Sequence, residues 1–385
     1  MESTKKDKLL FSPGPLTTSA TVKEAMLRDL GSLDSEFLAT VSNIRQRLLD
    51  LGPYPHEDYE CILMQGSGTF VVESVISSAI PRDGKMLVLV NGAYGRRIAQ
   101  TARVHGIALE VFEVAENKKF TAALVAEYLV SASGITHVAV VHCETTSGML
   151  NQVEEIGPVV HAAGASYIVD AMSSFGAVPI DMVGSHVDFL VSSANKCIEG
   201  VPGFGFVLAN RRALNSAKGN ARTLSLDLYD QWASMEANGH FRFTPPIHTI
   251  LAFEQALNEL DEEGGVSARG DRYRQNHFAL CRGMRALGFE IYLADEDQSF
   301  IITSFRYPSN TAFQFADFYE RLWALGFAIY PGKLSHESCF RIGTIGRIFT
   351  ADIEALLSAI SRVLHEMGVC SGSAVAQEQL SALNQ

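Results

Sequence analysis

The sequence lacks several features that would define a protein class at once. Its six cysteines, spread over 385 residues from Cys61 to Cys370, contain no CxxC pair. That spacing argues against a disulfide scaffold or a zinc site and is typical of reduced thiols in a cytosol-like compartment. No apolar run approaches the length that crosses a bilayer, and the start MESTKKDKLLF lacks the apolar centre of a secretory signal. We therefore expect a cytoplasmic protein with no membrane partner and no bound metal.

An excess of positive charge is also absent. The formal net charge is −12, so we expect no nucleic-acid partner, although a local positive pocket for a small anion stays open. Hydrophobic residues make up 47% of the chain and charged residues 19%. This composition excludes extensive disorder and permits a large buried core.

Short apolar segments alternate with helical patterns over the first half of the chain. The apolar segments are nearly continuous, as expected for strands covered on both faces. They lie at 61–64, 85–90, 108–114, 136–141, 166–169, 189–192 and 203–209, with helical patterns at 71–79, 95–105, 122–131 and 153–163. The alternation predicts an α/β fold, with a large three-layer α/β/α domain built on a mostly parallel sheet.

The pattern changes after about residue 212. Long helices are predicted at 246–264 and 266–287, then short strands at 290–293, 300–305, 328–330 and 339–342, with helices at 312–325 and 350–367. This order predicts a smaller α+β C-terminal domain. We place the large domain at 16–260, the small domain at 1–15 and 261–370, and a frayed tail at 371–385. Four arginines of the second long helix are expected on a solvated face: Arg269, Arg272, Arg274 and Arg282.

Two charged residues follow two consecutive predicted strands. Asp170 ends the strand at 166–169, and Lys196 follows the strand at 189–192 in the segment SANK. Ligands of open α/β sheets bind outside the carboxyl ends of the strands. A buried lysine there is favoured in its neutral form and can form an imine with an aldehyde cofactor, while a buried carboxylate needs a partner such as a protonated pyridine nitrogen. The alternatives are a surface lysine and a capping or surface-turn aspartate.

Three other strand ends carry polar or aromatic residues. GSGT at 66–69 opens a predicted helix, whose first N–H groups favour an anion, unless it is a plain helix cap. Tyr94, in NGAYG, follows the strand at 85–90 and can stack on a flat ring, or it is a packing tyrosine. ETTSG at 144–148 can hydrogen-bond a ring hydroxyl, or it is an ordinary turn. Together these signals place five elements on one edge of one sheet.

The order GSGT, NGAYG, ETTSG, Asp170 and SANK resembles the class V aminotransferases, which have the fold type I of pyridoxal-phosphate (PLP) enzymes. The resemblance covers roughly residues 9–368. Within the family, further segments are most similar to the 2-aminoethylphosphonate–pyruvate transaminases: SPGPLTTS, GSLDSEF, SLDLYDQW, FRFTPP, YPGKLS and CFRIGTIG.

The resemblance implies pyridoxal 5'-phosphate as cofactor and a role for each matching position. Lys196 would hold the cofactor and act as general base and acid, and Asp170 would pair with the ring nitrogen. Arg341 would bind the substrate acid, because its planar fork suits a carboxylate or phosphonate. Tyr94 would contact the ring and Thr145 the ring hydroxyl. The cofactor phosphate would be bound by Ser67, Gly68, Thr69 and Ser193, and across a homodimer interface by Thr244.

The implied reaction is transamination of 2-aminoethylphosphonate with pyruvate, giving phosphonoacetaldehyde and alanine. Alanine–glyoxylate and serine–pyruvate transaminases share the core motifs, which do not separate these donors. A cysteine desulfurase is disfavoured, because those enzymes usually have a histidine where Tyr94 stands. A phosphate-binding α/β protein without PLP chemistry is the alternative from another class. Arg96, Arg97 and Arg242 are further cations for the substrate, each with a structural interpretation.

Overall fold

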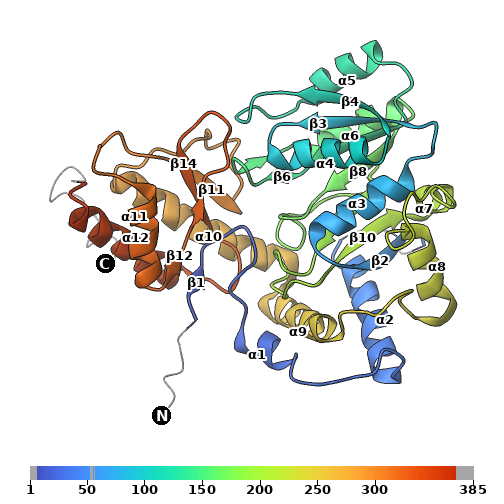
Figure 1. Cartoon of the computed structure of the whole chain (residues 1–385), viewed down its shortest axis with the longest axis horizontal. Coiled ribbons are helices and arrows are strands. Elements are labelled where there is room, and N and C mark those ends of the chain that lie inside the picture. The colour runs from blue at the N-terminus through green and yellow to red at the C-terminus, as the bar shows by residue number, and fades with distance from the viewer. Residues whose placement is uncertain (1–6, 53–54, 56, 370–385) are drawn as a thin grey trace.

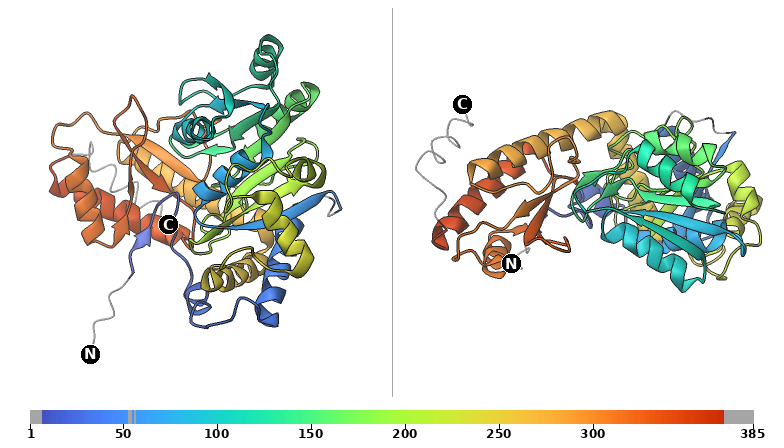
Figure 2. Two further views of the ribbon diagram at one scale, coloured as in Figure 1. Left: turned by 45° about the vertical axis from the view of Figure 1, so that its right-hand side comes forward. Right: turned by 90° about the horizontal axis from the view of Figure 1, so that it is seen from above.

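The computed structural model describes residues 7–52, 55 and 57–369. The predicted tail at 371–385, Cys370 and the first six residues of the predicted small domain lie outside this description. The chain forms two lobes, and the long helix α10 (Gly265–Ala286) extends from one lobe into the other (Figures 1 and 2). Within the described ranges, no helix combines the length and the apolar character needed to cross a membrane.

A seven-stranded sheet forms the centre of the larger lobe, in the order β2-β10-β9-β8-β5-β3-β4. Only β10 runs against the others, because both of its pairings are antiparallel. Each predicted strand of this part is present within two residues of its expected ends. The strands are β2 (Tyr59–Gln65), β3 (Lys85–Val90), β4 (Ala108–Glu113), β5 (His137–Val141), β8 (Ser166–Asp170), β9 (Phe189–Ser193) and β10 (Phe204–Asn210).

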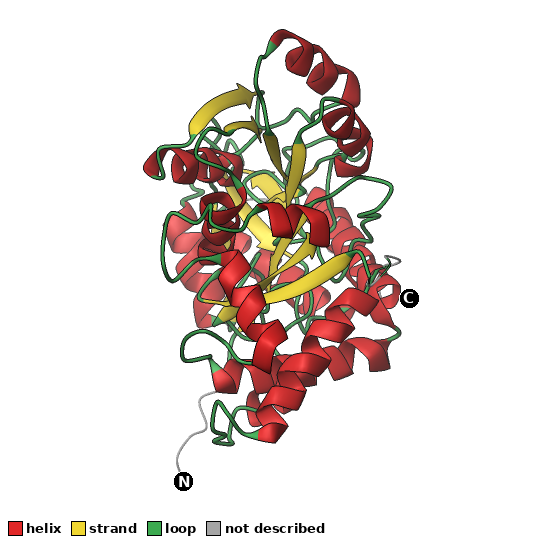
Figure 3. Ribbon diagram, turned by 90° about the vertical axis from the view of Figure 1, so that its right-hand side faces the viewer, coloured by secondary structure: helices red, strands yellow, loops and turns green. Residues whose placement is uncertain are grey.

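Helices cover both faces of this sheet (Figure 3). Successive residues of a strand point to opposite faces, so Leu63 and Leu87 join one buried cluster, whereas Met64 and Met86 join the other. The first cluster includes residues of α2 (Ser35–Asp50), α5 (Ala122–Ser131), α6 (Val153–Ala162) and α9 (Ile247–Glu263). The second includes α3 (Gly68–Ala79), α4 (Ala93–Val104), α7 (Arg211–Ser216) and α8 (Leu228–Asn238). The predicted three-layer arrangement is confirmed.

The smaller lobe has a three-stranded antiparallel sheet in the order β11 (Ile302–Arg306), β14 (Cys339–Gly343) and β13 (Tyr330–Pro331). Its core gathers aromatic side chains, among them Phe289, Phe305, Phe318 and Phe340, next to α11 (Phe315–Ala324) and α12 (Thr350–Glu366). Near the start of the chain, β1 (Leu9–Leu10) pairs in parallel with β12 (Phe327–Ala328), and α1 (Ala20–Glu24) follows it. The N-terminal segment therefore packs against the C-terminal part before the chain enters the larger lobe.

Several details of the C-terminal prediction are wrong. In place of a strand at 290–293 there is only an isolated bridge between Ile291 and Phe305. The predicted helix at 312–325 begins at Phe315, because a turn anchored by Asn310 precedes it: the carbonyl of Asn310 accepts a bond from the N–H of Phe313. The predicted strand at 328–330 is divided between β12 and β13.

The solvated face predicted for α10 is wrong for two of its four arginines. Arg274 and Arg282 are exposed, whereas Arg269 is fully buried and the Arg272 side chain is 10% exposed. Both buried guanidinium groups form ion pairs with Glu199 and Glu263. Carboxylates from outside the helix thus compensate the burial of charges that a helical pattern alone assigns to solvent.

Candidate active site

Asp170 and Lys196 lie at the carboxyl edge of two neighbouring strands. β8 pairs with β9 in parallel, with Asp170 opposite Val191. Asp170 ends β8, and Lys196 lies in the turn three residues beyond β9. Each charge shifts the pKa of the other group. The structure therefore brings together the two residues on which the sequence analysis depends.

The Asp170 carboxylate is buried, with 6% exposure. Burial raises its pKa from 3.8 to about 6, against the opposing effects of Lys196 and Arg97. Its Oδ1 accepts a hydrogen bond of 2.9 Å from the N–H of Met172. Among the described residues, it forms no ion pair with an arginine or lysine. Burying the ionised carboxylate without a cation costs free energy, and a cationic partner such as a protonated ring nitrogen would remove this cost.

The Lys196 amine points toward the N-terminal segment. Its Nζ donates a 2.5 Å hydrogen bond to the carbonyl of Pro13. Burial lowers the pKa of this amine, although Tyr94 and Asp170 act in the opposite direction. A Cβ on Gly14 would lie 2.5 Å from Nζ, and the φ of +123° at Gly14 also favours glycine. The segment SPGPLTTS thus supplies a wall of the lysine site, a role that the sequence analysis did not assign.

The GSGT segment leads into α3. Ser67 is the N-cap residue, and its side chain makes no capping hydrogen bond. The first N–H groups of a helix have no partner inside the helix, so this end of α3 presents free donors. Arg97 Nη1 donates a 3.3 Å hydrogen bond to Thr69 Oγ1 and adds a positive charge beside them. Such a helix end favours a phosphate group.

A small cavity of about 50 Å³ connects this helix end with the aspartate. It is lined by Gly68, Thr69, Val72, Tyr94, Arg97, Ile98, Thr101, Asp170 and Met172. The thioether of Met172 lies where a Cβ on Gly68 would be. Three of the five predicted strand-end elements therefore border one cavity.

Glu144 joins the NGAYG and ETTSG segments. Its Oε2 accepts hydrogen bonds from the N–H groups of Tyr94 (3.1 Å) and Gly95 (3.3 Å). Its Oε1 accepts bonds from the N–H (3.0 Å) and the hydroxyl (2.6 Å) of Thr146. Glu144 is fully buried, and burial raises its pKa. This carboxylate fixes the start of α4, a role that a local motif did not reveal.

Tyr94 lies at the centre of the polar contacts. Its phenol hydrogen-bonds with the side chain of Thr145, and although burial raises the phenol pKa, Lys333, Thr145 and Lys196 together lower it. Two cations approach the ring: the guanidinium carbon of Arg97 lies 5.0 Å and Lys333 Nζ 4.2 Å from the ring centroid. Lys333 belongs to the YPGKLS segment, in which no sequence pattern indicates a site residue.

Arg341 reaches this site from β14 of the smaller lobe. The residue is 5% exposed. Its Nε donates to the carbonyl of Pro331 (3.0 Å), and its Nη1 donates to the carbonyl of Thr145 in the larger lobe (2.7 Å). The side chain also hydrogen-bonds with Tyr94. No acidic residue in the described part of the chain forms an ion pair with it, although the Glu144 carboxylate acts to raise its pKa against the effect of burial. The buried guanidinium therefore lacks a carboxylate partner of its own.

Other predicted site residues lie at its margin. The Ser193 hydroxyl donates to Asn195 Oδ1 at 3.1 Å, at the carboxyl end of β9. Thr244 is exposed, and its carbonyl accepts a 3.3 Å bond from Gln65 Nε2. Arg242 binds the carbonyl of Leu224, and Arg96 pairs with two acidic side chains, Glu113 and Glu116. Arg96 and Arg242 thus have structural partners, and within one chain Thr244 does not line the cavity.

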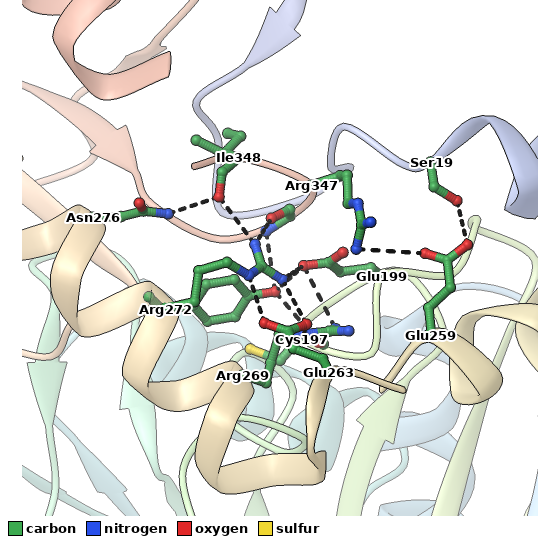
Figure 4. Close-up of polar contacts among 12 residues, drawn as sticks. Ser19, Cys197, Glu199, Glu259, Glu263, Arg269, Arg272, Asn276, Arg347 and Ile348 are labelled. Atoms are coloured by element: carbon green, nitrogen blue, oxygen red, sulfur yellow. Dashed lines mark hydrogen bonds and ion pairs between the residues drawn. The ribbon is translucent and has the colours of Figure 1, made fainter. Parts of the chain in front are cut away.

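The turn after Lys196 is held by the buried arginines of α10 (Figure 4). Arg269 Nη1 donates to the carbonyl of Cys197 at 2.7 Å. Glu199, in the left-handed region with φ +66°, accepts at Oε1 from Arg272 Nη2 (2.7 Å) and from the Tyr273 hydroxyl (2.5 Å). Arg272 Nη1 also donates to the carbonyl of Ile348, beyond β14. One ion-pair network therefore links the lysine turn to the chain that follows the Arg341 strand.

Comparison with known proteins agrees with this geometry. The family model described as Aminotransferase class-V matches residues 19–322. The 2-aminoethylphosphonate–pyruvate transaminase of Salmonella heidelberg (strain SL476) is 50% identical over 366 residues, which cover 94% of this chain and 100% of that protein. The transaminase of the same name from Salmonella typhimurium is 50% identical over 364 residues, which cover 94% and 99%.

Two solved structures share the fold. Pyridoxamine–pyruvate aminotransferase from Mesorhizobium loti has a TM-score of 0.88 at 24% identity, covering 98% of this chain and 97% of that chain. Ureidoglycine–glyoxylate aminotransferase from Bacillus subtilis has a TM-score of 0.88 at 20% identity, covering both chains completely. The predicted fold type I of PLP enzymes is confirmed. The chain belongs to the class V aminotransferase family.

Proposed function

We propose that this enzyme transfers the amino group of 2-aminoethylphosphonate to pyruvate, giving phosphonoacetaldehyde and alanine, with pyridoxal 5'-phosphate as cofactor. Relatives named for this reaction are 50% identical over nearly the whole chain. The structural observation that carries the proposal is the buried guanidinium of Arg341, which contacts Tyr94 and Thr145 and has no acidic partner among the described residues. A substrate acid would supply the missing negative charge.

The residues present fit the chemical groups of the cofactor. The Asp170 carboxylate, buried without a cationic partner, suits the ring nitrogen. The free N–H groups and hydroxyls at the start of α3, with Ser67, Gly68 and Thr69, suit the phosphate. We assign Ser193 to the phosphate, Thr145 to the ring hydroxyl and Tyr94 to the ring face. When bound, pyridoxal phosphate supplies an electron sink for the carbanion formed at the substrate.

The chain's own residues would perform the remaining steps. Asp170 would hold a proton on the ring nitrogen, because an ionised carboxylate at this buried position is stable only beside a cation. Lys196, whose pKa is lowered by burial, would take a proton at Nζ from the substrate carbon and return it to the cofactor side. Glu144 would keep Tyr94 in place through the backbone of α4.

Arg341 would orient both substrates through their acid groups. Its Nη1–Nη2 edge can bind two oxygens of a phosphonate or a carboxylate at once. Because the guanidinium also contacts Thr145 of the larger lobe, substrate would bind in the cleft between the proposed domains, 16–260 on one side and 1–15 with 261–370 on the other. One anchor thus serves the amino donor and the amino acceptor in turn.

We also propose that two copies of the chain form a homodimer. Apolar side chains are exposed beside the GSGT segment: Phe70 is 53%, Leu224 is 75% and Phe243 is 44% exposed. The FRFTPP segment is held there, since Gln65 Nε2 donates to the carbonyls of Phe243 and Thr244. A second copy would cover these side chains and would let the exposed Thr244 reach the partner's cofactor phosphate.

A screen of amino donors tests the reaction. The purified holoenzyme is given pyruvate with 2-aminoethylphosphonate, serine or taurine, and glyoxylate with alanine, and the amino acid formed is quantified. We expect the highest kcat/KM with 2-aminoethylphosphonate and no product with Lys196→Ala. A higher kcat/KM for alanine with glyoxylate, or for serine with pyruvate, would refute the proposed donor and leave the aminotransferase family assignment intact.

A further inference from the structure

The substrate site holds a second cation for which the mechanism above gives no task. We propose that Lys333 is the residue that distinguishes a phosphonate dianion from a carboxylate, acting beside Arg341. This inference rests on the proposed function and adds to it the residue that selects the donor. It follows from the position of Lys333, the lack of an acidic partner and the charges of the two substrate acids.

Lys333 lies beside Arg341 in the fold. It follows β13 by two residues, and β13 pairs with β14 so that Tyr330 lies opposite Arg341. The half-buried Lys333 places Nζ 4.2 Å from the centroid of the Tyr94 ring. The phenol of the same tyrosine hydrogen-bonds with Arg341, and its pKa is lowered by Lys333. Two cations of the smaller lobe therefore meet at one tyrosine of the larger lobe.

The backbone around Lys333 is fixed on both sides. Gly332 N–H donates to the carbonyl of Cys339 at 3.0 Å. Two residues beyond Lys333, the N–H and hydroxyl of Ser335 donate to Glu116 of the larger lobe at 2.9 and 3.0 Å. These contacts tie the segment to both lobes. The lysine side chain is therefore held near Tyr94 by its backbone and not by an ion pair of its own.

One acidic side chain contacts this segment and another belongs to it, and both are already paired. Glu116 pairs with Arg96, and Glu337 pairs with Arg306. In the part of the chain that the structure describes, Lys333 forms no hydrogen bond or ion pair with an acidic side chain, and neither does Arg341. Two cations thus lack an acidic partner of their own in a protein whose formal net charge is −12.

The two substrate acids differ in charge. A carboxylate carries one negative charge, which the fork of Arg341 compensates. A fully ionised phosphonate carries two and presents a third oxygen, for which a lysine is a suitable point charge on a flexible stem. Removing Lys333 should therefore weaken the interaction with a phosphonate much more than that with a carboxylate, whereas a lysine that only supports the fold would affect both acids alike.

The test compares wild-type holoenzyme with Lys333→Gln and Lys333→Arg. Single-turnover reactions of the donor half are followed with 2-aminoethylphosphonate, with taurine, which has a similar tetrahedral acid of one charge, and with alanine. We expect Lys333→Gln to lower kcat/KM for 2-aminoethylphosphonate tenfold or more and to change the values for taurine and alanine less than threefold. Lys333→Arg should restore most of the loss. The matched control is Lys218→Gln, because Lys218 Nζ lies 5.6 Å from the ring of Tyr229, outside the site.

Binding of inert acids separates this inference from the proposed reaction. Ethylphosphonate and propionate carry no amine, and their affinities for the holoenzyme are measured by calorimetry. We expect Lys333→Gln to lower the affinity for ethylphosphonate tenfold or more and the affinity for propionate less than threefold. Equal loss for both acids, or no loss for either, would overturn the role of Lys333. A wild-type enzyme that binds ethylphosphonate through Lys333 but does not turn over 2-aminoethylphosphonate would refute the reaction and leave the selective cation standing.

Discussion

Replacement of Arg341 by glutamine should strongly weaken the binding of both substrates through their acid groups. Nε and Nη1 already bind the carbonyls of Pro331 and Thr145, so the acid would bind at the Nη1–Nη2 edge. Two charge-assisted hydrogen bonds at that edge are worth roughly 3–5 kcal/mol together. Since about 1.4 kcal/mol corresponds to a tenfold change in rate, we expect kcat/KM to fall by roughly two to four orders of magnitude.

The loss should be the same for the phosphonate and the carboxylate, unlike the loss expected for Lys333→Gln. It is measured in both half-reactions, with 2-aminoethylphosphonate as donor and with pyruvate as acceptor, by following cofactor absorbance in single turnovers. Arg341→Lys should be intermediate, because it keeps the charge and loses the fork. Arg282→Gln, at an exposed position on α10, is the control. Unchanged kcat/KM for both acids in Arg341→Gln, or a loss of bound cofactor as its only effect, would refute the reasoning.

Three other perturbations test separate parts of the structure. Burial raises the pKa of Asp170 from 3.8 to about 6, so the ionised side chain destabilises the cofactor-free protein by about 3 kcal/mol above pH 6 and not at all below about pH 4. We therefore expect cofactor-free Asp170→Asn to be more stable than wild type in urea titrations at pH 7 and equally stable near pH 4. Equal stability at both pH values would contradict this. Glu199→Gln breaks a buried network and should lower the free energy of unfolding by about 3 kcal/mol. The control Asp261→Asn removes an ion pair with Arg47 at a side chain that is 63% exposed, and it should lower this free energy by less than about 1 kcal/mol. Similar losses for the two variants in urea titrations would argue against the network. Phe243→Asp should yield monomers in light-scattering measurements and weaken cofactor binding, and an intact dimer would place the interface elsewhere.

Local sequence patterns were sufficient for the larger lobe because all its strands except the edge strand β4 are almost wholly buried. The nearly continuous apolar run at 85–90 predicted both ends of β3 correctly. The polar residues that follow such strands indicated which edge of the sheet carries the site. Asp170 and Lys196 were found in this way, since Asp170 directly follows the apolar run at 166–169 and Lys196 lies three residues beyond β9. The shorter strands of the smaller lobe were placed less well, because two-residue pairings such as β1 with β12 depend on contacts across the whole chain.

Residues that act through distant partners left no local signal. Glu144 binds the N–H of Tyr94, fifty residues away in sequence. Arg272 belongs to a helix whose charged residues resemble a solvated face, yet its partner Glu199 lies 73 residues away. Lys333 is likewise defined by its distance from Tyr94 and by the absence of an acidic partner within the described residues. Only the folded arrangement identifies such residues, because each is defined by contacts with residues far away in the sequence.

The role of Lys196 is tested by locating the lysine that carries the cofactor. The holoenzyme is reduced with borohydride and digested, and the modified peptide is identified by mass spectrometry, with and without prior exposure to 2-aminoethylphosphonate in the absence of pyruvate. We expect a reduced cofactor adduct on Lys196 that disappears after exposure to the donor. An adduct on another lysine, or an adduct on Lys196 that the donor leaves unchanged, would contradict it.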